Sequence, residues 1–143
     1  MVTDTVELLK ECDVGCKCAT NSMEQVKPFL KEGNLKKVIE YYDKEHIQLG
    51  EKCHEMLDRL GEEERDPSGM AKVFSWVSTE IKMLCNDEEK KIADLMVDGC
   101  NMGIKSLTKY LNQYQEADPE SRDLAIKLIH LEQHFRDELL GYL

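Results

Sequence analysis

The 143-residue chain carries 29 acidic and 19 basic side chains, for a formal net charge of −10, and 41% of its residues are hydrophobic. This balance is typical of a folded domain with one hydrophobic core, and it excludes a disordered chain. The negative surface disfavours nucleic acid and anionic membranes as partners, and no apolar run is long enough to span a bilayer. We therefore expect a single domain over residues 1–143.

The N-terminus lacks the basic and apolar regions of a signal peptide, which predicts a cytoplasmic protein. Cysteines in a reducing compartment are expected to stay free rather than to form a disulfide framework. Such a number of free thiols suits an anaerobic or well-reduced cytoplasm. The six cysteines are Cys12, Cys16, Cys18, Cys53, Cys85 and Cys100.

The first half of the chain predicts two long helices. Pro is scarce, with three residues, and Gly with eight, so long uninterrupted helices are expected. The first helix should kink or end at Pro28, because proline removes a backbone donor and crowds the preceding turn. The second helix covers residues 34–60, with apolar positions at alternating steps of four and three, and Gly61 ends it.

The second half predicts an additional helical segment and two more long helices. Asp66 before Pro67 has the pattern of a helix start, and the segment 66–84 should pack along the bundle as a crossover. The third long helix covers residues 87–114, and the fourth begins at Asp118. These elements predict an all-α fold, a ferritin-like four-helix bundle with one crossover and an extra helical segment between helices 2 and 3. A weak repeat between residues 12–17 and 100–105 agrees with two related helical hairpins.

Four polar residues on or beside apolar helix faces are candidate metal ligands, because a buried carboxylate or imidazole needs a partner. Asp13 and His46 occupy central positions of the first and second helices. Asp43 lies one turn before His46, a spacing close to the Glu-x-x-His of di-iron bundles, and Glu132 flanks the apolar face of the fourth helix. The alternative is that Asp13 and His46 form a buried hydrogen-bonded pair that fixes the helix register.

Other polar residues carry a weaker signal. The third helix offers Cys100, with Gly103 nearby, where a di-iron site would need a carboxylate, while Asp94 and Asp98 point away from its apolar side. His130 and His134 are expected to face solvent. Glu51 and His54 match the ligand spacing but fall off the apolar stripe of the second helix, so they are discounted.

The spacing Cys12-x-x-x-Cys16 favours core packing over zinc binding, because helical thiols lack the converging loop of a zinc knuckle. Redox sensing by these thiols has no further support in the sequence. A nucleotide-binding glycine loop and an activated-nucleophile motif are not found, so an enzyme is not indicated.

Three stretches carry a resemblance to a known family. They are the opening at residues 9–15, the tract Phe74-Ser75-Trp76, and residues 92–103. In these the chain resembles an uncharacterised bacterial family of ferritin-like domains of unknown function, of a type found in anaerobic Firmicutes. The resemblance implies a four-helix bundle and, in some relatives, carboxylates suited to two iron ions. Transferred by position, Asp13 would be the first-helix carboxylate and His46 a second-helix ligand.

Two functions follow as hypotheses. The first is a non-enzymatic association module or stress-linked accessory protein, which would form a homodimer through Ile126, Ile129 and Leu140 on the fourth helix. The alternative is a degenerate di-iron or single-metal protein that binds iron or another divalent ion through Asp13, Asp43, His46 and Glu132, with Cys100 as a further ligand.

Overall fold

The computed structural model describes residues 2–64, 80–82 and 88–143. Its long helices are α1 (Val2–Val26), α2 (Asn34–Arg59), α4 (Glu89–Gln113) and α5 (Pro119–Leu140), and the 3₁₀ turn η1 (Lys27–Phe29) follows α1. The predicted all-α class is confirmed for this part of the chain, which contains helices and no strands.

The helix ends have identifiable local causes. Pro28 lies in η1, directly after α1, so the first helix ends where the sequence predicts. After α2, Gly61 adopts a positive φ of 70°, and the amides of Gly61 and Glu62 donate to the carbonyls of Asp58 and Leu57. This pairing is a Schellman motif, which requires a residue that tolerates left-handed backbone.

Asp118 caps α5. Its side chain accepts a hydrogen bond from the Ser121 amide at 2.8 Å, and Pro119 occupies the first helical position. Both features match the start predicted for the fourth helix.

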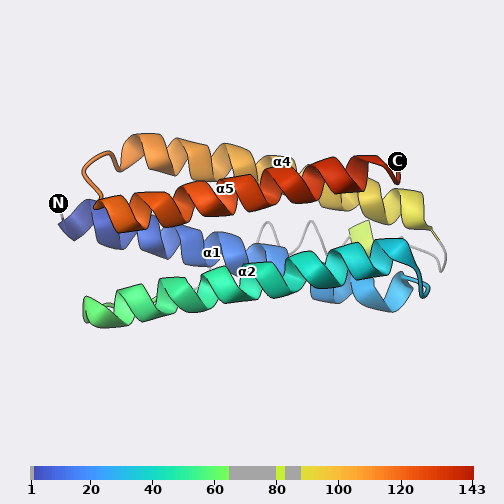
Figure 1. Ribbon diagram of the computed structural model, residues 1–143, viewed down its shortest axis with the longest axis horizontal. Helices are drawn as coiled ribbons and strands as arrows, with labels where there is room; N and C mark the ends of the chain where they lie inside the picture. The colour runs from blue at the N-terminus through green and yellow to red at the C-terminus, as the bar shows by residue number, and fades with distance from the viewer. Residues whose placement is uncertain (1, 65–79, 83–87) are drawn as a thin grey trace.

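The four long helices lie along a common direction (Figure 1). Helices α1 and α2 form one antiparallel hairpin and α4 and α5 a second, while α1 contacts both α4 and α5, and α2 contacts α5. In Figure 1, α2 ends at the left end of the bundle and α4 begins at the right end, so these two helices run in the same direction.

Among the described residues, the core forms two apolar clusters, one toward each end of the bundle. The cluster near the α1–α2 turn includes Met23, Ile39, Ile92 and Phe135, and the other includes Leu9, Cys53, Leu107, Leu124 and Leu128. Leu131 packs against both clusters. The buried polar residues His46 and Glu132 are members of neither cluster.

Some predictions lie outside the described residues or need correction. Most of the predicted segment 66–84 is outside them, although residues 80–82 are helical. Within the proposed association surface, Ile126 and Leu140 are 37% and 47% exposed, but Ile129 is buried because it turns toward the core cluster of Leu124 and Leu128. None of the helices described has the length and apolar character required to cross a membrane.

Candidate metal centre

A buried ion pair joins α2 to α5 at the middle of the bundle. The Nε2 atom of His46 lies 2.5 Å from Oε1 of Glu132, and the side chains are 0% and 8% exposed. The other ring nitrogen, Nδ1, lies 2.7 Å from the backbone carbonyl oxygen of Tyr42. Phe135 meets the imidazole edge to face, with 6.3 Å between ring centroids.

The contact with the Tyr42 carbonyl defines which ring nitrogen of His46 carries a proton. A carbonyl oxygen only accepts hydrogen bonds, so Nδ1 carries a proton and donates it to Tyr42. The proton between Nε2 and Glu132 then belongs to an imidazolium or to a protonated carboxyl. Burial lowers the pKa of His46, but the hydrogen bond and the charge of Glu132 outweigh it, so the net shift is upward.

The charge of Glu132 also acts on one thiol of each remaining long helix. Burial and then the charge of the Glu132 carboxylate raise the pKa of Cys100 on α4. Cys18 on α1 has a pKa raised to about 11 by burial and by the charge of Glu132. Gly103 on α4 faces Glu132, since a Cβ at that position would lie 3.5 Å from the carboxyl carbon, an ordinary contact distance.

A second polar cluster lies at the α1–α2 interface. Asp13 on α1 hydrogen-bonds through Oδ1 to Nε2 of His54 on α2, and Oε2 of Glu64 lies 2.6 Å from the same nitrogen. Asp13 is 1% exposed, whereas the side chains of His54 and Glu64 are 44% and 47% exposed. One ligand atom from each of these three residues lies within 4.8 Å of the other two.

Lys17 closes the other side of this cluster. Its Nζ atom lies 2.9 Å from Oδ2 of Asp13 and 3.3 Å from Oε1 of Glu64. Burial lowers the Lys17 pKa, but the interactions with the two carboxylates raise it by more, for a net upward shift. Each carboxylate thus turns one oxygen to the lysine and the other to His54.

The donor set fits a divalent transition-metal ion. A single nitrogen cannot donate one proton fully to two carboxylate oxygens, whereas a cation between the three atoms would bind all of them. Ligand atoms on zinc lie about 2.0–2.2 Å from the ion and therefore about 3 Å or slightly more from one another. Opening the contacts of His54 with Asp13 and Glu64 by less than about 1 Å would accommodate the ion.

Asp43 belongs to a different ion pair. It is 2% exposed, and its Oδ2 atom lies 2.6 Å from Nζ of Lys27, which also contacts Glu24 at 2.9 Å. Burial and the neighbouring Glu24 raise the pKa of Asp43 despite the lysine. These contacts tie the end of α1 and the turn after it to α2.

The predicted ligands therefore lie in three places. His46 and Glu132 meet, with Cys100 beside them; Asp13 lies with His54; and Asp43 pairs with Lys27. The predicted pair of Asp13 with His46 is wrong, because each has a different partner. His130 and His134 are exposed, as are Asp94 and Asp98, as predicted.

Discounting His54 because it falls off the apolar stripe of the second helix was wrong, since His54 contacts Asp13; the position of the hairpin turn holds the signal that could have identified it. In an antiparallel helical hairpin, residues at equal distances from the turn lie opposite each other. Asp13 is 20 residues before Gly33 (33 − 13) and His54 is 21 after it (54 − 33). His46 is only 13 after it (46 − 33), which places it opposite the region of Thr20 rather than Asp13.

Three buried thiols lie next to the second cluster. Cys12 and Cys16 on α1 and Cys53 on α2 belong to the same core cluster. Interaction with Cys53 and burial raise the pKa values of Cys12 and Cys16, and the same interaction lowers the Cys53 pKa. None of the described cysteines forms a disulfide bond.

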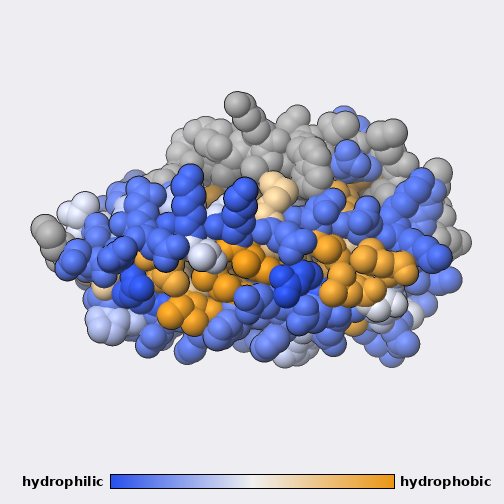
Figure 2. Space-filling view, turned by 90° about the horizontal axis from the view of Figure 1, so that it is seen from above, coloured by the Kyte–Doolittle hydropathy of each residue, from blue (hydrophilic) through white to orange (hydrophobic). Residues whose placement is uncertain are grey.

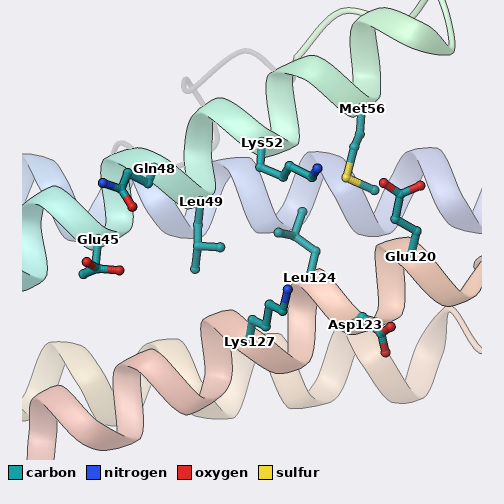
Figure 3. A pocket seen from close by; sticks show the side chains of 9 residues that line it. All are labelled: Glu45, Gln48, Leu49, Lys52, Met56, Glu120, Asp123, Leu124 and Lys127. Atoms are coloured by element: carbon teal, nitrogen blue, oxygen red, sulfur yellow. The ribbon is translucent and has the colours of Figure 1, made fainter.

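A pocket of about 500 Å³ opens between α2 and α5 (Figure 3). Lys52 from α2 and Lys127 from α5 extend into it, with Leu49, Leu124 and Met56 among the apolar lining. Its lining includes none of the residues of the two polar clusters, so the pocket is separate from the candidate metal centre.

Comparison of the chain with protein-family models, with curated protein sequences and with solved structures gives no match in any of the three. Function therefore has to be argued from the chemistry of the residues.

Proposed function

We propose that the chain is a metal-binding helical-bundle protein that holds a divalent transition-metal ion at Asp13, His54 and Glu64. The observation that supports the proposal is the convergence of one imidazole nitrogen and two carboxylate oxygens within 4.8 Å. Imidazole and carboxylate suit zinc, iron and manganese. Three protein ligands would leave a position open for water or another small ligand.

The environment of the cluster supports a site with access to solvent. Asp13 is buried, so its carboxylate is held in place, while His54 and Glu64 reach the surface. Lys17 takes the outer oxygens and offsets part of the negative charge, which leaves a cluster of two carboxylates against one permanent cation. A divalent ion would replace the proton that His54 shares with its two carboxylate neighbours.

Titration with Zn²⁺ followed by isothermal calorimetry tests this proposal. The wild-type chain should bind about one equivalent, and His54→Gln and Glu64→Gln should each lose most of that binding. His134→Gln is the matched control, because His134 is an exposed histidine on α5. Equal Zn²⁺ binding by His54→Gln and the control would refute the proposal.

We also propose the finer ferritin-like topology and a reducing, cytoplasmic setting. Two antiparallel hairpins, with α2 and α4 running in the same direction, support a connection that passes from one end of the bundle to the other. The free state of the described cysteines supports a reducing compartment. The resemblance to ferritin-like domains of Firmicutes stays a prediction.

A second candidate function is association with another copy of the chain, in the role of an accessory module. Apolar side chains form a line between hydrophilic ones on the face seen in Figure 2. Exposed apolar residues on α4, on α5 and at the C-terminus support this candidate: Met102, Ile126, Leu140 and Leu143. Light scattering should detect a dimer that Ile126→Lys with Leu140→Lys dissociates, and a wild-type monomer at high concentration would exclude it.

A further inference from the structure

The pocket between α2 and α5 is elongated. Its α2 side extends from Glu45 to Met56, and its α5 side extends from Glu120 to Lys127. At a helical rise of about 1.5 Å per residue, the α2 side is about 16 Å long. The volume of about 500 Å³ lies within the range of about 300–1,000 Å³ that small-molecule sites occupy. The pocket therefore has room for one small, elongated molecule.

The floor of this pocket is apolar. Met56 and Leu124 are 4% and 5% exposed, and Leu49 is half-buried beside them. In Figure 3, Leu49 and Leu124 point into the space between the two helices. The flexible thioether of Met56 can adapt to the shape of a molecule that lies against it. An apolar group that covers this floor would leave water, which favours binding.

Two ammonium groups are available above the floor. Lys52 and Lys127 extend into the pocket from opposite helices, with Leu124 between them (Figure 3). In the part of the chain that the structure describes, neither lysine has an ion-pair partner. Asp123 precedes Lys127 by four residues, a spacing at which ion pairs form on helix surfaces, yet the two do not pair. Both ammonium groups can therefore donate hydrogen bonds to a bound anion.

The acidic residues of the lining limit the charge of that anion. Glu45, Glu120 and Asp123 also line the pocket. Arg59 lies 3.2 Å from Glu120 and offsets its charge, which leaves two carboxylates against the two lysines. A ligand with several negative charges would be repelled by these carboxylates, whereas a single negative group between the lysines would not exceed the charge available to it.

We propose that this pocket binds an amphipathic monoanion, a carboxylate with a short apolar chain. The head group lies between the two lysines, and the chain covers the apolar floor. A carboxylate has two acceptor oxygens, so it can accept one charge-assisted hydrogen bond from each ammonium. The pocket is separate from the Asp13–His54–Glu64 centre, since none of those three residues lines it.

Isothermal calorimetry with octanoate tests the proposal. Wild type should bind one equivalent, and Lys52→Met with Lys127→Met should bind it about tenfold more weakly or worse, because the charge-assisted hydrogen bonds are lost while the apolar stems remain. Lys44→Met with Lys105→Met is the matched control, because it removes the same charge from exposed positions on α2 and α4. Equal octanoate affinity in the two double variants, or no binding by wild type, would overturn the proposal.

Two shorter comparisons separate the head group from the chain. Acetate has the carboxylate without the chain, and octanol has the chain without the charge, so each should bind wild type more weakly than octanoate. Octanol binding as tight as octanoate binding would contradict a role for the lysines.

A second measurement needs no variant and locates the bound molecule. In protein with ¹³C-labelled methionine methyl groups, octanoate should shift the NMR signal of Met56 in the pocket. The signal of Met102, which is 43% exposed on α4, should stay in place. A shift of Met102 without a shift of Met56 would overturn the proposal, because octanoate would then bind to another apolar surface.

Discussion

Replacement of His46 by Leu should destabilise the bundle strongly. The change removes the partner of Glu132 but leaves its carboxylate buried, with a side chain only 8% exposed. Breaking a buried ion pair from one side typically costs about 3–5 kcal/mol, because the remaining charge has lost both its partner and its water. The same change also removes the hydrogen bond to the Tyr42 carbonyl, whose acceptor is 2.7 Å from the ring.

The size of the effect is measurable by unfolding in urea and by heat, followed by far-ultraviolet circular dichroism. For a chain of about this length, each kcal/mol lowers the melting temperature by about 2–4 °C, so a loss of about 3–5 kcal/mol should lower the melting temperature by about 6–20 °C. Replacing both partners, His46→Leu with Glu132→Met, should recover a large part of the loss, because no buried charge remains.

Two outcomes would refute this reasoning. A loss below about 1 kcal/mol in His46→Leu would mean that Glu132 is solvated or finds another partner. A double variant as unstable as the sum of the two single variants would mean that the side chains do not interact.

Three further predictions concern the same helices. The His46 pKa is raised above its unfolded value of about 6.5, so the stability that protonated His46 contributes is fully present below that pH and is lost as pH rises through the folded pKa. The difference in free energy of unfolding between wild type and His46→Gln should therefore be larger near pH 6 than near pH 9. A difference that grows with pH would contradict the assignment. Gly99→Ala should raise the free energy of unfolding by about 0.5–1 kcal/mol, because the glycine is inside α4 and a Cβ there would meet nothing within 4 Å; a lower melting temperature would show that the site is crowded. Asp118→Ala should lower the free energy of unfolding by about 1 kcal/mol, because the cap on the Ser121 amide is lost. Asp118→Asn should retain most of the stability. Equal losses in the two variants would argue against a capping role.

The helices could be predicted from the sequence because their signals are local. Apolar spacing marked the face of α2, and Pro28, Gly61 and Asp118 marked helix ends by their effect on the backbone of their own turn. Burial of Asp13 and His46 also followed from their positions on an apolar face. Each of these inferences needs only the residues within one helix or one turn.

The partners of the polar residues could not be assigned from the faces alone, because partnership depends on the offset between helices. Asp13 and His46 are central in their own helices, yet the register of the α1–α2 hairpin places His54 opposite Asp13. Glu64 lies after the end of α2, where no helical period applies, and it reaches His54 from there. His46 and Glu132 are 86 residues apart in sequence, and their contact depends on how the two hairpins pack against each other.

The most direct test of the proposed divalent centre is elemental analysis of protein purified anaerobically from cells supplied with iron and zinc. Wild type and His46→Gln should contain about one divalent ion per chain, and Asp13→Asn with His54→Gln should contain almost none. Equal metal content in wild type and in Asp13→Asn with His54→Gln would contradict the assignment of the centre to Asp13, His54 and Glu64.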